Sequence, residues 1–177
     1  YYGVIGLNKY MVRYATERFL DIELTATNNT GLKIPSSAVT EEEFYTIPKE
    51  YLTTGGNSNS YGFICEEYNS SGELTTKFVE ADIYKSDDSV CYVSTEDFAA
   101  GNSIIKPDSS DRYVIGPTEK LKGVYCINTG YTVFKLVEII DENNEYIIAK
   151  RNVSYGISVY DRIVLDADKY SVNQLIY

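Results

Sequence analysis

Short β-rich runs separated by turn-forming stretches recur along this chain and limit what it can fold into. Apolar and polar residues alternate over residues 20–25, and a period of two places the apolar set on one face of a strand. Similar runs lie at Val90–Val93, Val133–Ile140, Tyr146–Ala149 and Ile163–Leu165. The pattern predicts an all-β protein built from small β-barrel or sandwich units.

Glycine, asparagine, aspartate and serine cluster between these runs, as is typical of tight turns. These stretches are Asn28–Gly31, Gly55–Ser60, Asn69–Gly72, Lys85–Ser89 and Asp141–Asn144. Evidence for helices is thin. Thr40 and Glu43 match a capping box, but Pro48 would end a helix early and the segment reads equally well as a strand. We expect only short helical turns, near Asn8–Tyr14 and at Pro48–Leu52.

The middle and the end of the chain are similar to each other. Residues 43–48 can be laid over 123–128, and four further pairs of segments follow in the same order. These pairs are Lys77–Glu80 with Lys135–Glu138, Asp87-Asp88 with Asp141-Glu142, Cys91–Val93 with Tyr146–Ile148, and Gly101–Ile105 with Tyr160–Val164. The similarity indicates two related β units joined at residues 106–110. The alternative is that any two β meanders share this rhythm.

The composition excludes several classes of protein. The net charge of −10 repels polyphosphate, and the 16 Lys and Arg form no basic run, so nucleic acid is not expected as a partner. No apolar stretch reaches the length of a membrane-spanning helix. Because the chain opens with Tyr1 rather than Met, we expect it to be a fragment of a longer protein.

Residues that could carry chemistry are few, and we predict no enzyme, no cofactor and no metal site. The chain has no His, so a cysteine nucleophile would lack its usual base. Cys65, Cys91 and Cys126 are widely spaced and are expected to be small buried apolar residues. Acidic groups at Asp87-Asp88, Asp108 with Asp111, and Glu41-Glu42-Glu43 read as turns or a solvated face. No phosphate-binding or nucleophile-elbow motif is present.

Two segments resemble parts of the membrane fusion proteins, the HlyD-like periplasmic adaptor subunits of bacterial efflux and secretion systems. Residues 31–39, GLKIPSSAV, are similar to the apolar-Pro-x-x-Ala strand that leaves the family's β-barrel domain. Residues 123–138 and 156–165 resemble its membrane-proximal domain, in which a β meander ends in a Gly-Leu-x-x-Gly-Asp-x-Val-like turn and strand. The segments stand in the family's order.

The chain also departs from the family pattern. A long insert separates the two segments where the family has a short link, and Tyr160 stands where the pattern has Gly. The family's helical hairpin and lipoyl-like domain have no counterpart in these residues. The resemblance implies three parts: a β-barrel-like remnant over 1–40, an inserted β unit over 41–107 and a membrane-proximal-like β unit over 112–177.

By the same resemblance, the function would be mechanical. Such adaptors lie outside the cytoplasm, are tethered to the membrane through a segment missing from this chain, and dock onto a transporter permease during export. The full-length protein would be a possible homo-oligomer. The alternative is a cell-surface carbohydrate-binding or adhesin-like β domain, in which some of the 18 Tyr would stack on sugars, although the absence of Trp counts against it.

Overall fold

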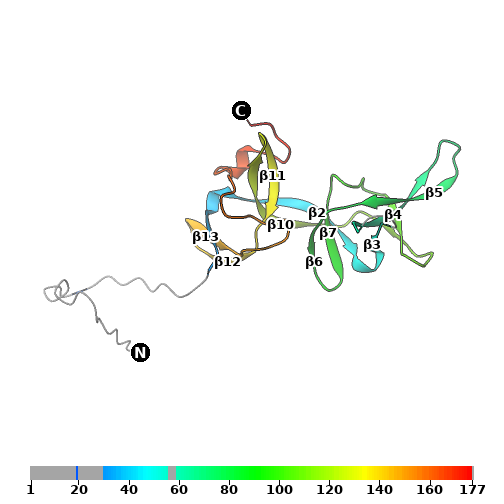
Figure 1. Cartoon of the computed structure of the whole chain (residues 1–177), viewed down its shortest axis with the longest axis horizontal. Helices are drawn as coiled ribbons and strands as arrows, with labels where there is room; N and C mark the ends of the chain where they lie inside the picture. Colours follow the sequence, from blue (N-terminus) through cyan, green and yellow to red (C-terminus); the bar gives the residue numbers. More distant parts are fainter. Residues whose placement is uncertain (1–18, 20–29, 56–58, 177) are drawn as a thin grey trace, which may run out of the picture.

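The computed structural model describes residues 19, 30–55 and 59–176 (Figure 1). Over these ranges every regular element is a strand or a short 3-10 turn, which confirms the predicted all-β class. The strands are β1 (Leu32–Pro35), β2 (Val39–Pro48), β3 (Thr53–Thr54), β4 (Tyr61–Tyr68), β5 (Leu74–Glu80), β6 (Ile83–Ser86), β7 (Val90–Ser94), β8 (Ser103–Ile105), β9 (Arg112–Val114), β10 (Thr118–Asn128), β11 (Tyr131–Leu136), β12 (Ile139–Glu142) and β13 (Tyr146–Ala149). The 3-10 turns are η1 (Ser36–Ala38), η2 (Lys49–Tyr51) and η3 (Ala167–Lys169). None of these helical segments is long or apolar enough to cross a bilayer.

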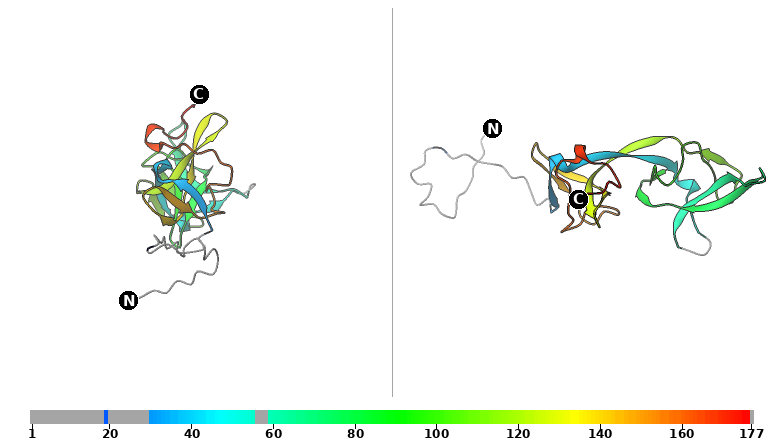
Figure 2. Two further views of the ribbon diagram at one scale, coloured as in Figure 1. Left: turned by 90° about the vertical axis from the view of Figure 1, so that its left-hand side faces the viewer. Right: turned by 90° about the horizontal axis from the view of Figure 1, so that it is seen from above.

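The strands form three sheets, and the two longest strands, β2 and β10, lie side by side in the central one. The central sheet has the order β11-β10-β2-β7-β6, a second sheet has the order β1-β13-β12, and the third runs β3-β4-β8-β9 with β5 on the other edge of β4. Figures 1 and 2 show two bodies arranged along the long axis of the molecule, with β2 and β10 passing between them. All pairings between named strands are antiparallel.

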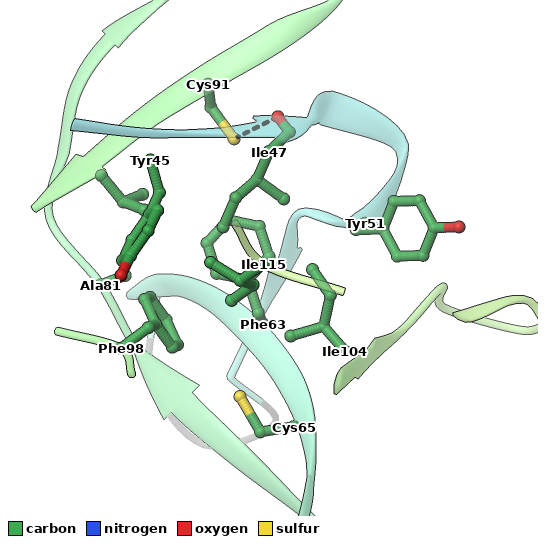
Figure 3. Packing of buried hydrophobic residues seen from close by; sticks show 11 residues of the cluster. Tyr45, Ile47, Tyr51, Phe63, Cys65, Ala81, Cys91, Phe98, Ile104 and Ile115 are labelled. Atoms are coloured by element: carbon green, nitrogen blue, oxygen red, sulfur yellow. Dashed lines mark hydrogen bonds between the residues drawn. The ribbon is translucent and has the colours of Figure 1, made fainter. Parts of the chain in front are cut away.

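We call these bodies the inserted unit, residues 44–115, and the framing unit, residues 30–43 with 116–176. One buried cluster lies wholly in the inserted unit (Figure 3), and a second lies wholly in the framing unit. A third cluster contains Phe44 and Tyr92 together with Tyr125 and Phe134, so it packs residues of both units against each other. The two units therefore share part of their apolar core.

The same pattern of strand pairing occurs in both units. In the inserted unit β2 pairs with β7, β7 with β6, β4 with β5, and β4 with β8. In the framing unit β1 pairs with β13, β13 with β12, and β10 with β11, while an isolated bridge at Ile163 takes the place of β8 beside β10. An Ile-Pro pair followed by a 3-10 turn leads into the next strand in each unit. The two units thus share a pairing pattern, but the expected joint at 106–110 is wrong, because these residues form the turn between the paired strands β8 and β9 within the inserted unit.

The register of the pairs identifies equivalent positions. Thr53 lies opposite Gly62 in one unit, and Thr40 lies opposite Gly123 in the other. Further along, Cys65 pairs with Ile104 as Cys126 pairs with Ile163. A bulge interrupts the β6–β7 pair and the β12–β13 pair at the same place.

Only part of the alignment expected from sequence has the right register. The expected match of 101–105 with 160–164 agrees with the structure. The expected partner of Phe78 in the other unit is two residues from the position that the strand pairing gives, and the expected partner of Cys91 is one residue away. The expected match of 43–48 with 123–128 is wrong, because β10 corresponds to β4 and the first strand of the framing unit is β1. Pairing partners far apart in the chain leave no local signal from which this could be read.

Other expectations differ in detail. The run expected over 133–140 is two strands, because the chain leaves β11 and enters another sheet at β12. The run at 163–165 forms only a single bridge. The helical turn expected at 48–52 is present as η2, whereas the strand expected over 20–25 and the turn expected at 8–14 lie outside the described residues. The described part of the segment expected to be a barrel remnant, 30–40, pairs with β13 and β10.

Candidate interaction surface

A surface groove of the framing unit lies between β1 and the turn that follows Gly156. The side chains that line it are mostly apolar, with one lysine, one serine and one aspartate: Leu32, Lys33, Ile34, Ile157, Ser158, Val159, Tyr160, Asp161 and Ile163. The groove joins the two segments that carry the family resemblance, although a whole unit separates them in sequence. It is therefore built from residues of both ends of the framing unit.

Hydrogen bonds to one carboxylate hold the turn in place. The Asp161 Oδ2 atom accepts a hydrogen bond from the Ser158 backbone N–H at 2.7 Å and one from Lys135 Nζ at 2.8 Å. Partial burial alone would raise the pKa of Asp161, but the bonds from Lys135 and Ser158 outweigh it and hold that pKa below its ordinary value. The carboxylate is thus ionised at neutral pH and ties the turn to β11.

Tyr160 lies at the tip of this turn with its side chain 97% exposed. Its φ of 74° falls in the left-handed region, which costs a residue with a Cβ about 1–2 kcal/mol. The equivalent position of the inserted unit is Gly101, whose φ is 91°. The backbone of this turn therefore favours glycine in both copies, and the framing unit carries an exposed aromatic ring there despite the strain.

Apolar side chains continue on either side of Tyr160. Val159 is 55% exposed, and Ile127 is 37% exposed. Ile127 lies beside the turn, because its backbone N–H donates to the carbonyl of Arg162 at 2.8 Å. Tyrosine is enriched where proteins contact one another, since one residue supplies a large apolar face and a polar tip. Strain at an exposed position is a reason to examine it for function, and this surface is suited to protein contact.

A second group of polar side chains lies between the units. Tyr155 donates from its hydroxyl to Asp82 Oδ1 at 2.7 Å and stacks on Tyr84, with ring centroids 4.7 Å apart. Burial and then the hydrogen bond to Asp82 raise the pKa of Tyr155 to about 12. Burial and then the charge of Asp82 raise the pKa of Asp97. The group holds the two units together through a tyrosine stack and a carboxylate, and sequence reasoning missed it because its members are distant in the chain.

The acidic pairs expected to be structural lie in turns. Asp87 accepts a hydrogen bond from the Val90 backbone N–H at 3.2 Å, within the β6–β7 turn. Asp108 has a φ of 57° in the turn between β8 and β9, and Asp111 donates its backbone N–H to Ser109 Oγ. Asp87 thus makes the side-chain contact of a turn-forming aspartate, whereas Asp108 and Asp111 lie in a turn without such a side-chain bond among the described residues.

The three consecutive glutamates lie on β2. Glu41 and Glu43 are exposed, whereas Glu42 accepts a hydrogen bond from the hydroxyl of Tyr125. Burial and then this bond raise the pKa of Tyr125 to about 12. Over the described ranges, no three His, Cys, Asp or Glu side chains gather as a metal site would need.

The three cysteines are buried, as expected, and all three are free. Cys65 and Cys91 belong to the core of the inserted unit, where Cys91 Sγ donates to the carbonyl of Ile47 at 3.3 Å (Figure 3). Cys126 belongs to the core of the framing unit. Burial raises the pKa of Cys91 and that of Cys126 to about 11, and it also raises the pKa of Cys65. At neutral pH these thiols are protonated and behave as apolar core residues.

Comparison with known proteins gives no relative from which a role could be transferred. No family model, no curated protein and no solved structure matches this chain.

Proposed function

We propose that this chain is a non-catalytic, extracytoplasmic adaptor module of a membrane transport complex that docks onto a transporter permease. The proposal rests on the resemblance to HlyD-like membrane fusion proteins. In such a complex the module would be tethered to the membrane through a segment outside the given sequence. Its role would be to hold a protein surface in position rather than to transform a substrate.

One observation supports the proposal above the others. The Ile34-Pro35 strand resembles the one that leaves the family's β-barrel domain, and the residues around Gly123 and Ile163 resemble the membrane-proximal domain that follows it; these segments meet in the framing unit despite the inserted unit between them. The inserted unit repeats the same pairing pattern. An extra copy of the domain would account for the long insert without changing what the framing unit does.

The groove beside Tyr160 is the surface that we assign to the permease. An exposed ring on a turn held by Asp161 can enter a pocket of a partner with little loss of conformational freedom, because the backbone of the turn is already fixed. Buried aromatic anchors of this kind carry much of the energy of protein interfaces. Lys33 adds one positive charge to the lining of the groove, with its ammonium 3.6 Å from the centroid of the Tyr146 ring.

The test is binding of the purified 177-residue chain to a detergent-solubilised efflux permease, measured by co-purification and by titration. Tyr160→Gly is the informative variant, because it removes the ring and relieves the left-handed strain, so that weaker binding cannot be caused by a damaged fold. We expect affinity to fall by about 10-fold or more. Tyr61→Ala is the matched control, since Tyr61 is 56% exposed and belongs to the inserted unit.

Two results would contradict this assignment. Equal binding of Tyr160→Gly and the parent chain would remove the groove from the interface. Binding to a glycan array, together with no binding to the permease, would instead favour the carbohydrate-binding alternative.

A further inference from the structure

The β4–β5 hairpin is the most exposed paired structure of the inserted unit. It projects at the end of the molecule opposite the framing unit (Figure 1). Near its tip Tyr68 lies opposite Leu74, and these side chains are 76% and 48% exposed. Further from the tip, on the same face, Ile64 lies opposite Phe78, and both side chains are half-buried. A two-stranded ribbon with apolar residues on an open face is marginally stable in water.

One edge of this hairpin has free backbone groups. The hydrogen bonds from Asn69 N–H to Glu73 O and from Ala81 N–H to Tyr61 O show that odd-numbered residues of β5 face β4. In an antiparallel pair, successive residues of a strand direct their backbone N–H and C=O groups alternately toward the partner strand and away from it. Leu74, Thr76 and Phe78 therefore direct these groups outward. Over the described residues no strand pairs with this edge.

The framing unit shows what such an edge can accept. By register, Thr132 of β11 is equivalent to Thr76 of β5. Thr132 donates its N–H to the carbonyl of Gln174 and accepts from the N–H of Asn173, so the C-terminal segment runs along the edge of β11. Thr132 is fully buried as a result, whereas Thr76 is exposed. One copy of the fold thus has a covered edge, and the other has the same edge open.

We propose that the open edge of β5 pairs with the β5 edge of a second copy of this chain. A two-fold axis at Thr76 would place Thr76 opposite its own symmetry mate and Leu74 opposite Phe78 of the other copy. Because these residues all direct their backbone groups outward, the two edges would form a regular antiparallel ladder. A two-fold contact requires such a self-complementary surface.

The side chains fit this register as well as the backbone does. Threonine facing threonine and leucine facing phenylalanine are both favourable cross-strand pairs. Lys77 would lie opposite Thr75, so no like charges face each other directly, and the diagonal neighbours of Lys77 on the other copy would be Glu73 and Lys77. On each copy the apolar pairs Ile64–Phe78 and Tyr68–Leu74 would lie on one face of the joined ribbon, with the polar pair Glu66–Thr76 between them.

The contact is small, so the association is expected to be weak. Two short edges bury less than the roughly 1,200 Å² of a stable interface, and dimers should therefore form only as concentration rises. Sedimentation equilibrium of the 177-residue chain over a concentration series should show mass rising from one chain toward two. The inference does not depend on the proposed docking to a permease, since it concerns the opposite end of the molecule.

Charge substitution at the symmetry axis gives a decisive test. Thr76→Lys and Thr76→Glu each place two like charges face to face, and we expect each variant alone to be monomeric over the whole series. An equal mixture should regain dimers, because lysine then faces glutamate. That recovery also shows that both variants are folded.

Thr118→Lys is the control, since Thr118 is an exposed threonine of β10 that pairs with Tyr45 of β2 and not with β5, and we expect it to dimerise as the parent chain does. A parent chain that stays monomeric at every concentration would overturn the proposal. A dimer that survives Thr76→Lys would overturn it too, because association would then use another surface.

Discussion

Gly123 provides the sharpest test of the duplicated architecture. It lies on β10 between Thr40 of β2 and Leu136 of β11. A Cβ at this position would lie 2.5 Å from the carbonyl oxygen of Lys135 and would overlap the ring of Phe134. Gly62, its equivalent in the inserted unit, is covered in the same way, since a Cβ there would lie 2.6 Å from Cζ of Phe78. In both copies an aromatic ring therefore occupies the space above a strand glycine.

The cost of Gly123→Ala follows from what would have to move. Paired strands hold β10 on both sides, so the Lys135 carbonyl cannot withdraw without disturbing the ladder, and the Phe134 ring is only 4% exposed. Overpacking of this kind costs about 1–3 kcal/mol, and the involvement of backbone places the expected value at about 2–3 kcal/mol. For a chain of this size each kcal/mol lowers Tm by about 2–4 °C, so we expect a loss of about 4–12 °C.

Thermal unfolding followed by circular dichroism or calorimetry measures this loss. Gly116→Ala is the control, because no atom lies within 4 Å of a Cβ at that position, and its effect should stay within about 0.5 kcal/mol. Gly62→Ala should resemble Gly123→Ala if the two sites are equivalent. If Gly123→Ala melts within error of Gly116→Ala, the reasoning from close packing over glycine is refuted.

Three other outcomes are expected. The buried cysteines, two of which have a thiol pKa of about 11, should resist alkylation in the native chain at neutral pH and react fully in denaturant; rapid native labelling would contradict their burial. Asp161 has a lowered pKa, so its ionic contribution should be present above its ordinary pKa of 3.8 and be lost as pH falls through the lower native value. In acid titrations Asp161→Asn should therefore be less stable than the parent near neutrality, and the two should converge at low pH; a constant difference would argue against the linkage. Tyr160→Gly should gain about 1 kcal/mol, or about 2–4 °C in Tm, and a loss of stability would show that the ring packs on its own chain.

The fold class follows from the sequence because period-two patterning and turn residues are local signals. The β4–β5 turn is one example, in which Asn69 Oδ1 accepts from the backbone N–H groups of Ser71 and Glu73. The partner of each strand is not a local property. Leu32 pairs with Ala149 across the whole inserted unit, and nothing in either segment specifies the other. The alignment of the two copies was therefore recognisable but displaced, since the hairpin loops of the copies differ in length and carry no information on register.

The candidate surface could be predicted in part for the same reason. Tyr160 was recognised because a glycine is expected at that step of the pattern, and the equivalent residue Gly101 makes the comparison within the chain itself. The groove beside it could not be foreseen, since Leu32 and Ile157 approach only after β1 has paired with β13. The tyrosine and carboxylate group around Asp82 depends likewise on how the two units pack.

Comparison of the two copies shows that they expose different features at equivalent positions. The framing unit covers the edge of β11 with its C-terminal segment and exposes Tyr160, whereas the inserted unit has Gly101 at that turn and exposes the edge of β5. The two proposed contacts therefore use different structural positions at opposite ends of the molecule and should be independent. Thr76→Lys should abolish self-association while leaving permease binding unchanged, and Tyr160→Gly should have the reverse effect. If either variant abolished both, the surfaces would be coupled through the shared core around Phe134, and the assignment of one contact to each copy would be wrong.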